Sequence, residues 1–265
     1  MRLGWPILVC CLAAGDKAFG DDSSLAVLVG PGTLRPLFPP SPSATDIFVP
    51  AFWLDRRPVT NADFQSFVAR SRTWRRGSVS QLYVDQAYLA HWATPDELGA
   101  AAAPDQPVVN VSWFAARAYC AARGARLATE DEWELAAQAS PSAPDGKNDV
   151  GWRKTVVDWY GKPSPARLPA VGQGSPNYWG IWDLHGLVWE WVRDFNGTLL
   201  AEDDGRGQKD ANSNRFCGGA RVASDSLDYP SYMRVALRSS LEARYTTANL
   251  GFRCAHDAVP SGGGK

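Results

Sequence analysis

The sequence lacks most of the short motifs that identify an enzyme class. It contains no Gly-x-Ser-x-Gly elbow, no Gly-x-Gly-x-x-Gly loop and no phosphate-binding Gly-Lys-Ser/Thr motif, so the local signatures of several hydrolase and nucleotide-binding families are absent. Histidine is scarce as well. His91, His185 and His256 have no second histidine or cysteine at ligand spacing, which argues against a zinc site and predicts surface or core histidines.

The chain also has almost no net charge. Its 27 basic and 28 acidic side chains give a net charge of -1 without a basic stripe, which argues against nucleic acid or an anionic membrane as the main partner. With 265 residues, 45% of them hydrophobic, it can bury a substantial core. Its 12 tryptophans indicate a rigid core with little regular structure or an aromatic binding surface, and the core is the safer interpretation.

The N-terminus carries a predicted export signal in residues 1–20. Arg2 precedes an apolar run from Trp5 to Ala14, and Ala18 and Gly20 have the spacing of a cleavage site. The run is too short to span a membrane. We therefore expect a periplasmic or secreted mature chain that begins near Asp21 and has no membrane attachment after cleavage.

Cysteine is rare in the predicted mature chain. Cys10 and Cys11 leave with the signal, so Cys120, Cys217 and Cys254 remain. An odd number in an oxidising compartment is most simply one disulfide and one spare thiol, with buried thiols as the alternative. Cys217 lies near Arg215 and Arg221 and is either a reactive thiolate or a small buried side chain.

Local signals predict short elements in a loop-rich chain. Proline, glycine and serine make residues 21–45 extended or irregular, and the stretch "IFVPAFWLD" at 47–55 favours a strand. A helix follows with Thr60 or Asn61 as its N-cap. Residues 140–177 contain many loop formers, and residues 258–265 are a predicted flexible tail.

Two further helices are predicted in the middle of the chain. Ser112 can cap a helix that runs to Arg123, and Gly124 stands where a left-handed residue ends it. Thr129 and Glu132 form a capping box for the next helix.

One acidic loop could bind a hard cation. Asp183 and Glu190 lie seven residues apart around Gly186, a spacing that can bring two carboxylates and main-chain carbonyls to one calcium ion. The alternative is a capped turn with two solvated acids.

Four stretches together resemble the sulfatase-modifying-factor superfamily, which includes the formylglycine-generating enzymes. They are "FWLDRRPVTNADFQSFV", "QPVVNVSWFAARAYCAARGARLATEDEWELAA", "NYWGIWDLHGLVWEWVRDF" and "GG…MRVALRSS…NLGFRCA". The resemblance implies a single α+β domain over residues 46–257, with a C-type-lectin-like core and little regular secondary structure.

The same resemblance implies a disulfide and a structural calcium site. The disulfide would join Cys120 to Cys254. Calcium would be held by the side chains of Asp183 and Glu190 and the carbonyls of Gly186 and Val188.

The resemblance stops at the copper centre. Formylglycine-generating members carry two cysteines after the glycine pair, and these bind copper(I). Here Ala223 occupies the first position, and no cysteine occurs at 228–230, where the second falls. Because copper(I) needs soft thiolate ligands, we do not expect copper binding or sulfatase activation. Exported members without the pair, such as the pyoverdine maturation protein and the accessory protein encoded with copper nitrite reductases, resemble the chain most.

The sequence is compatible with three functions, and it does not decide whether the protein is an enzyme. The first is a periplasmic maturation factor for a protein or peptide substrate, with an oxidoreductase centre formed by Cys217, Asp228, Tyr229 and Arg234, near Asp225 and Arg238. The second is a non-catalytic lectin-like binding module. The third is a formylglycine-generating oxidase whose copper is held by Cys217.

Overall fold

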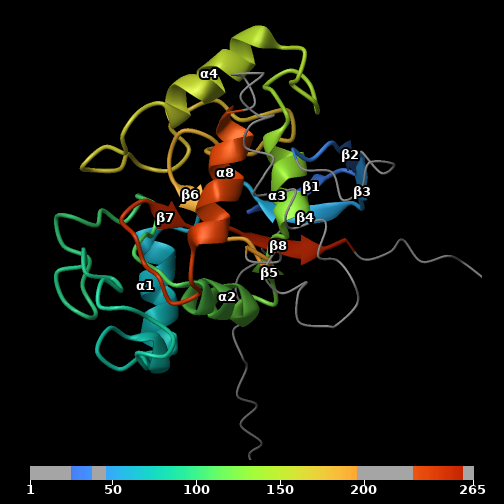
Figure 1. Ribbon diagram of the computed structural model, residues 1–265. Helices are drawn as coiled ribbons and strands as arrows, with labels where there is room; N and C mark the ends of the chain where they lie inside the picture. The colour runs from blue at the N-terminus through green and yellow to red at the C-terminus, as the bar shows by residue number, and fades with distance from the viewer. Residues whose placement is uncertain (1–24, 38–45, 196–228, 259–265) are drawn as a thin grey trace, which may run out of the picture.

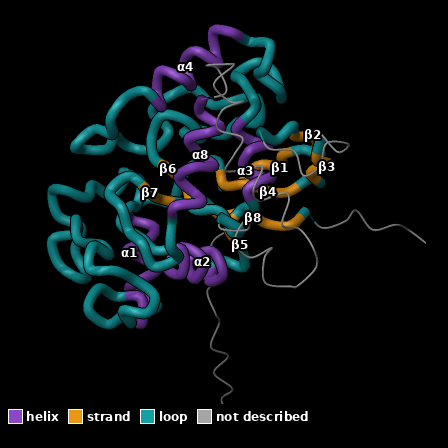
Figure 2. Tube along the Cα trace, in the orientation of Figure 1, coloured by secondary structure: helices purple, strands orange, loops and turns teal. Residues whose placement is uncertain are grey.

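The protein is a mixed helix-and-sheet structure in which loops outweigh regular elements. The computed structural model describes residues 25–37, 46–195 and 229–258 (Figures 1 and 2). Its helices are α1 (Asn61–Arg70), η2 (Arg72–Trp74, a 3₁₀ turn), α2 (Trp113–Ala122), α3 (Glu130–Ala137), α4 (Val150–Tyr160) and α8 (Tyr229–Ser240). Its strands are β1 (Ala26–Val29), β2 (Gly32–Leu34), β3 (Ile47–Val49), β4 (Phe52–Asp55), β5 (Arg126–Leu127), β6 (Trp189–Glu190), β7 (Leu250–Gly251) and β8 (Cys254–Asp257).

The central sheet joins both ends of the described chain. Its strand order is β1–β4–β8–β5, and all neighbours are antiparallel. Leu54 at its centre pairs with Val27 on one side and Ala255 on the other. The strands β2 and β3 form an antiparallel pair, and β6 and β7 form a short parallel pair.

The predicted strand at 47–55 is corrected to two strands in different sheets. Proline has no N–H to donate to a ladder, and the chain breaks at Pro50: β3 pairs with β2, whereas β4 pairs with β1 and β8. The extended character expected before residue 46 is found in β1 and β2. Because β1 pairs with β4, it belongs to the central sheet, whereas β2 pairs with β3.

The three predicted helices are confirmed together with their caps. Thr60 caps α1 in a capping box with Asp63. The Ala115 N–H donates to Ser112 Oγ at 3.2 Å at the start of α2, and Gly124 follows the helix with φ +68°. Before α3, the Glu132 N–H donates to Thr129 Oγ1 at 3.2 Å, while the Thr129 N–H donates to Glu132 Oε2 at 2.8 Å.

Two α-helices, α4 and α8, were not anticipated. The 11-residue α4 lies in the predicted loop region, begins with Asp149 as its N-cap and buries only Val156, so its sequence has little apolar periodicity to detect. The helix α8 buries Pro230, Arg234 and Arg238. The buried face of a helix usually carries apolar residues, so a helix that buries two arginines is not detected by its hydrophobic pattern.

The core lies between the central sheet and the helices α1 and α2. The rings of Phe64 and Tyr119 stack with centroids 5.8 Å apart, and Phe252 packs edge-on against Tyr119 at 5.4 Å. The Cys120–Cys254 disulfide implied by the resemblance is present and joins α2 to β8. The predicted signal at 1–20 lies outside the described residues. No helix among those described is long and apolar enough to cross a membrane.

Candidate functional site

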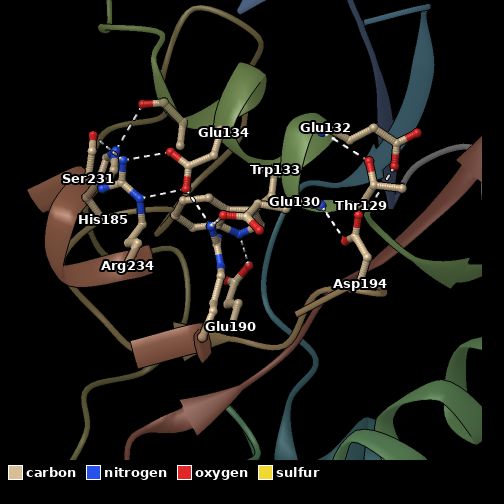
Figure 3. Close-up of polar contacts among 12 residues, drawn as sticks. Thr129, Glu130, Glu132, Trp133, Glu134, His185, Glu190, Asp194, Ser231 and Arg234 are labelled. Carbon is tan, nitrogen blue, oxygen red and sulfur yellow. Dashed lines mark hydrogen bonds and ion pairs between the residues drawn. The ribbon is translucent and has the colours of Figure 1, made fainter. Parts of the chain in front are cut away.

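The candidate site lies where α8 packs beside α3 (Figures 1 and 3). Residues three and four apart share one face of a helix, so Glu130, Trp133 and Glu134 of α3 project together. Their partners, Arg234 and Arg238, are also four residues apart on α8. This set of five side chains is called the α3–α8 cluster below.

Glu134 is the hub of the α3–α8 cluster. Its Oε1 accepts from Arg234 Nε at 2.8 Å and from Arg238 Nη1 at 2.7 Å, and its Oε2 accepts from Arg234 Nη2 at 2.7 Å. The arginine side chains are 7% and 6% exposed, so water screens these ion pairs weakly. Burial raises the pKa of Glu134, but the two guanidinium groups outweigh it and lower the pKa to about 2.

Aromatic rings complete the environment of the two arginines. The Arg234 guanidinium lies 5.5 Å from the ring centroids of both Trp133 and Tyr160, and that of Arg238 lies 5.0 Å from Trp133. Arg234 also donates to the hydroxyl oxygens of Tyr160 and Ser231. Cation–π contacts at desolvated positions add to the ion pairs.

Glu130 is the weaker carboxylate of the α3–α8 cluster. Its Oε1 accepts from Arg238 Nη1 at 3.1 Å, and its side chain is 32% exposed. Burial raises the pKa of Glu130, and Arg238 opposes that rise. Glu130 therefore supports Arg238 from the solvent side, whereas Glu134 binds both arginines inside.

A second buried ion pair lies on the other side of Trp133. Glu190 and Arg253 have side chains 0% and 1% exposed, and the closest N···O distance between them is 2.7 Å. The Trp133 indole N–H donates to Glu190 Oε2 at 2.7 Å. Arg253, just before β8, also donates to the carbonyls of Asp55 and Trp182, so this pair ties β6 to the end of β4 and to the loop before β6.

His185 lies among aromatic rings next to the α3–α8 cluster. Its ring centroid is 5.9–6.1 Å from those of Trp133, Trp152 and Tyr160. Its Nε2 lies 2.9 Å from the carbonyl oxygen of Ala137, while its buried Nδ1 has no hydrogen-bond partner. Since the carbonyl can only accept, Nε2 carries the proton. Burial lowers the pKa of His185 to about 4, so the ring is neutral at pH 7.

A small pocket lies between α8 and this aromatic group. It is lined by Trp133, Tyr160, Leu184, Val188, Trp189, Glu190, Arg234, Leu237, Arg238 and Leu241. Its volume is about 10 Å³, close to the minimum for one water molecule. With α8 in its present position, the pocket is too small for a substrate.

The predicted catalytic residues fall in different environments. Cys217, Asp225 and Asp228 lie outside the described residues. Tyr229 begins α8 and is 41% exposed, while Arg234 points into the α3–α8 cluster and is held by Glu134.

The acidic half of the α3–α8 cluster was missed by sequence reasoning, as was His185. The sequence does contain one relevant pattern, because Glu130 and Glu134 are four residues apart, as are Arg234 and Arg238. Charge spacing alone does not say which helices pair.

The predicted calcium residues lie in the loop before β6 and at the end of β6, and the carboxylates of Asp183 and Glu190 already accept hydrogen bonds. Asp183 Oδ2 accepts from the Gly172 N–H at 2.6 Å, and both oxygens of Glu190 accept from Arg253. Nowhere in the described ranges do three or more His, Cys, Asp or Glu side chains form a metal-binding group. Glu190 does not fit a calcium ligand in this arrangement. The site, with the carbonyls of Gly186 and Val188, stays a prediction.

Comparison with known proteins identifies related sequences over most of the chain. A family model described as "Sulfatase-modifying factor enzyme 1-like domain" matches residues 11–258. The "Formylglycine-generating enzyme" of Streptomyces coelicolor is 35% identical over 193 residues, which cover 64% of this chain and 59% of that relative. The chain thus spans about three fifths of that relative's length.

Two further similarities concern proteins with other names. The "Inactive C-alpha-formylglycine-generating enzyme 2" of Bos taurus is 29% identical over 262 residues, covering 80% of this chain and 79% of the relative. The solved structure of PvdO from Pseudomonas aeruginosa aligns with a TM-score of 0.47 and 17% identity, over 88% of this chain and 94% of that one.

Proposed function

The chain belongs to the sulfatase-modifying factor enzyme 1-like family, and from this premise we propose that it is an exported maturation or accessory factor. It acts on a protein or peptide client without the copper chemistry of formylglycine-generating enzymes. Its location is periplasmic or secreted, and its partner is another exported polypeptide.

The cysteine inventory carries this proposal. The disulfide engages Cys120 and Cys254, so Cys217 is the one thiol left beyond the first twenty residues. Neither Ala223 nor the stretch 228–230 supplies a second. A copper(I) centre built on two thiolates cannot be assembled from one, and carboxylates are poor substitutes for a soft metal.

The α3–α8 cluster favours a second candidate, a non-catalytic binding module. Arg234 and Arg238 lie in the segment that the resemblance assigns to the active region, yet both are buried in ion pairs with α3. They hold a helix rather than face a substrate. On the outer side of that helix, Tyr229 and Tyr232 are 41% and 36% exposed, a composition suited to polypeptide contact.

A peptide assay tests whether the copper chemistry is absent. Purified mature protein is incubated with copper(I), oxygen and a peptide containing Cys-x-Pro-x-Arg, and the product is analysed by mass spectrometry. We expect no conversion of the peptide cysteine to formylglycine, while the S. coelicolor relative serves as positive control. Conversion at a comparable rate would contradict the proposal and support the oxidase hypothesis centred on Cys217.

Complementation of a deletion strain separates the two remaining functions. The host is complemented with wild type, Cys217→Ser, Asp228→Asn, or a Tyr229→Ala/Tyr232→Ala double variant, and the activity of exported metalloenzymes such as copper nitrite reductase is measured. Loss with Cys217→Ser or Asp228→Asn supports an oxidoreductase centre. Loss with the tyrosine variant alone supports the binding module. An unchanged host phenotype on deletion would contradict both, and cell fractionation tests export directly.

A further inference from the structure

The helix α8 is attached to the protein differently from α1, α2 and α3. Those helices bury aromatic and aliphatic side chains, such as Phe64 of α1 and Leu135 of α3. The fully buried residues of α8 are Pro230, Arg234 and Arg238. Its Met233, Val235 and Leu237 are only half-buried, so apolar burial contributes less to holding this helix.

The ionic attachment of α8 converges on one carboxylate. Glu134 receives two hydrogen bonds from Arg234 and one from Arg238. The remaining polar contacts of Arg234 are to Tyr160 of α4 and to Ser231 of α8 itself. Removing the charge of Glu134 would therefore weaken both arginine anchors in one step.

A buried ion pair holds two elements together only while both of its charges are present. The cost of desolvating the charges offsets most of their attraction, and losing one partner leaves the other charge uncompensated. An element held this way can open at a lower free energy than one held by packed aliphatic residues. The hydrophobic core of the central sheet contains residues such as Leu54 and Phe252 but neither Arg234 nor Arg238, so the sheet does not depend on the two arginines of α8.

The opening of α8 would uncover a defined surface. The pocket beneath it has Trp133, Tyr160 and Trp189 among its lining residues, with Leu184 and Val188 beside them. Since Leu237, Arg238 and Leu241 line its other side, displacement of α8 would widen this small space into a groove lined mainly by aromatic and aliphatic side chains.

We propose that α8 is a lid latched to α3 by Glu134. It opens as a unit without unfolding of the central sheet and exposes the aromatic surface of Trp133, Tyr160 and Trp189. This inference does not depend on the proposed function, and its test needs no client.

Hydrogen exchange followed by mass spectrometry tests the lid in the full mature chain. In the wild type, we expect amides of α8 to exchange at least about tenfold faster than those of β4 and β8, which corresponds to an opening about 1.4 kcal/mol easier. In Glu134→Gln, exchange of α8 should rise by a further factor of about ten or more, with β4 and β8 unchanged. Fluorescence of the dye 8-anilinonaphthalenesulfonate should increase as the apolar surface opens.

Glu130→Gln is the matched control on the same helix. The Glu130 carboxylate accepts one hydrogen bond from Arg238 and is partly exposed, so we expect less than about a threefold change in α8 exchange. Equal effects of the two variants would refute the special role of Glu134. A Glu134→Gln protein that fails to fold, or that loses protection equally in α8 and the sheet, would refute the lid. So would wild-type α8 amides that exchange only through global unfolding.

Discussion

The replacement Glu190→Gln measures how far the buried Glu190–Arg253 pair supports the fold. The variant keeps the size of the side chain but removes its charge, so Arg253, with its side chain 1% exposed, stays buried without a counter-charge. Breaking such a pair costs about 3–5 kcal/mol, a large share of the roughly 5–15 kcal/mol that stabilises a typical domain. We expect the midpoint of thermal unfolding to fall by about 6–20 °C, at about 2–4 °C per kcal/mol for a chain of this size.

The assay is thermal and urea unfolding monitored by tryptophan fluorescence and far-UV circular dichroism. Glu242→Gln is the control, because its carboxylate is exposed and contacts Arg244 and Tyr245 at the surface, and its loss should cost under about 0.5 kcal/mol. The double variant Glu190→Gln/Arg253→Met removes both charges and should recover part of the loss. A cost below about 1 kcal/mol for Glu190→Gln would refute the reasoning.

Three further outcomes are expected. Cys120→Ser/Cys254→Ser should lower the free energy of unfolding by about 5 kcal/mol in the chain-entropy model, because the bond spans 134 residues; equal urea midpoints for variant and wild type would contradict this. Burial lowers the pKa of His185 from 6.5 to about 4, so its contribution to the free energy of unfolding is complete above pH 6.5 and is lost as the pH falls towards 4. Urea unfolding between pH 4 and 6.5 should show a smaller pH dependence of this free energy for His185→Gln than for the wild type. Equal pH dependence in the two proteins would contradict this prediction. Metal analysis and calcium titration of wild type and Asp183→Asn test the predicted calcium site, which predicts one bound equivalent that the variant weakens; a metal-free wild type without calcium response would exclude it.

Local signals predicted the helices α1, α2 and α3 through their caps. Side-chain oxygens of Thr60, Ser112 and Thr129 accept from N–H groups within the next three residues, so the information needed to start each helix lies inside a few positions of sequence. The break between β3 and β4 is also specified locally, because Pro50 has no N–H to donate to a strand ladder.

Long-range charge pairing could not be predicted in the same way. Arg234 and Glu134 lie 100 positions apart, and the buried face of α8 shows no apolar periodicity. The resemblance placed Arg234 near an active centre, whereas in the structure Arg234 forms an ion pair with Glu134. The spacing of Asp183 and Glu190 predicted that both bind one cation. Spacing contains no information about Arg253, which lies just before β8 and binds Glu190.

The sequence by itself determined the family, the absence of cysteine at positions 223 and 228–230 and the helices α1, α2 and α3, because each depends on which residues are present or on contacts within one turn. The tertiary structure alone decided that Glu134 holds α8, that Arg253 binds Glu190 and that the pocket beneath α8 is too small for a substrate. In each case, segments that are far apart in the sequence come together and exclude water from charged groups. The free energy of a buried charge depends on these neighbours in space, and local sequence does not specify them.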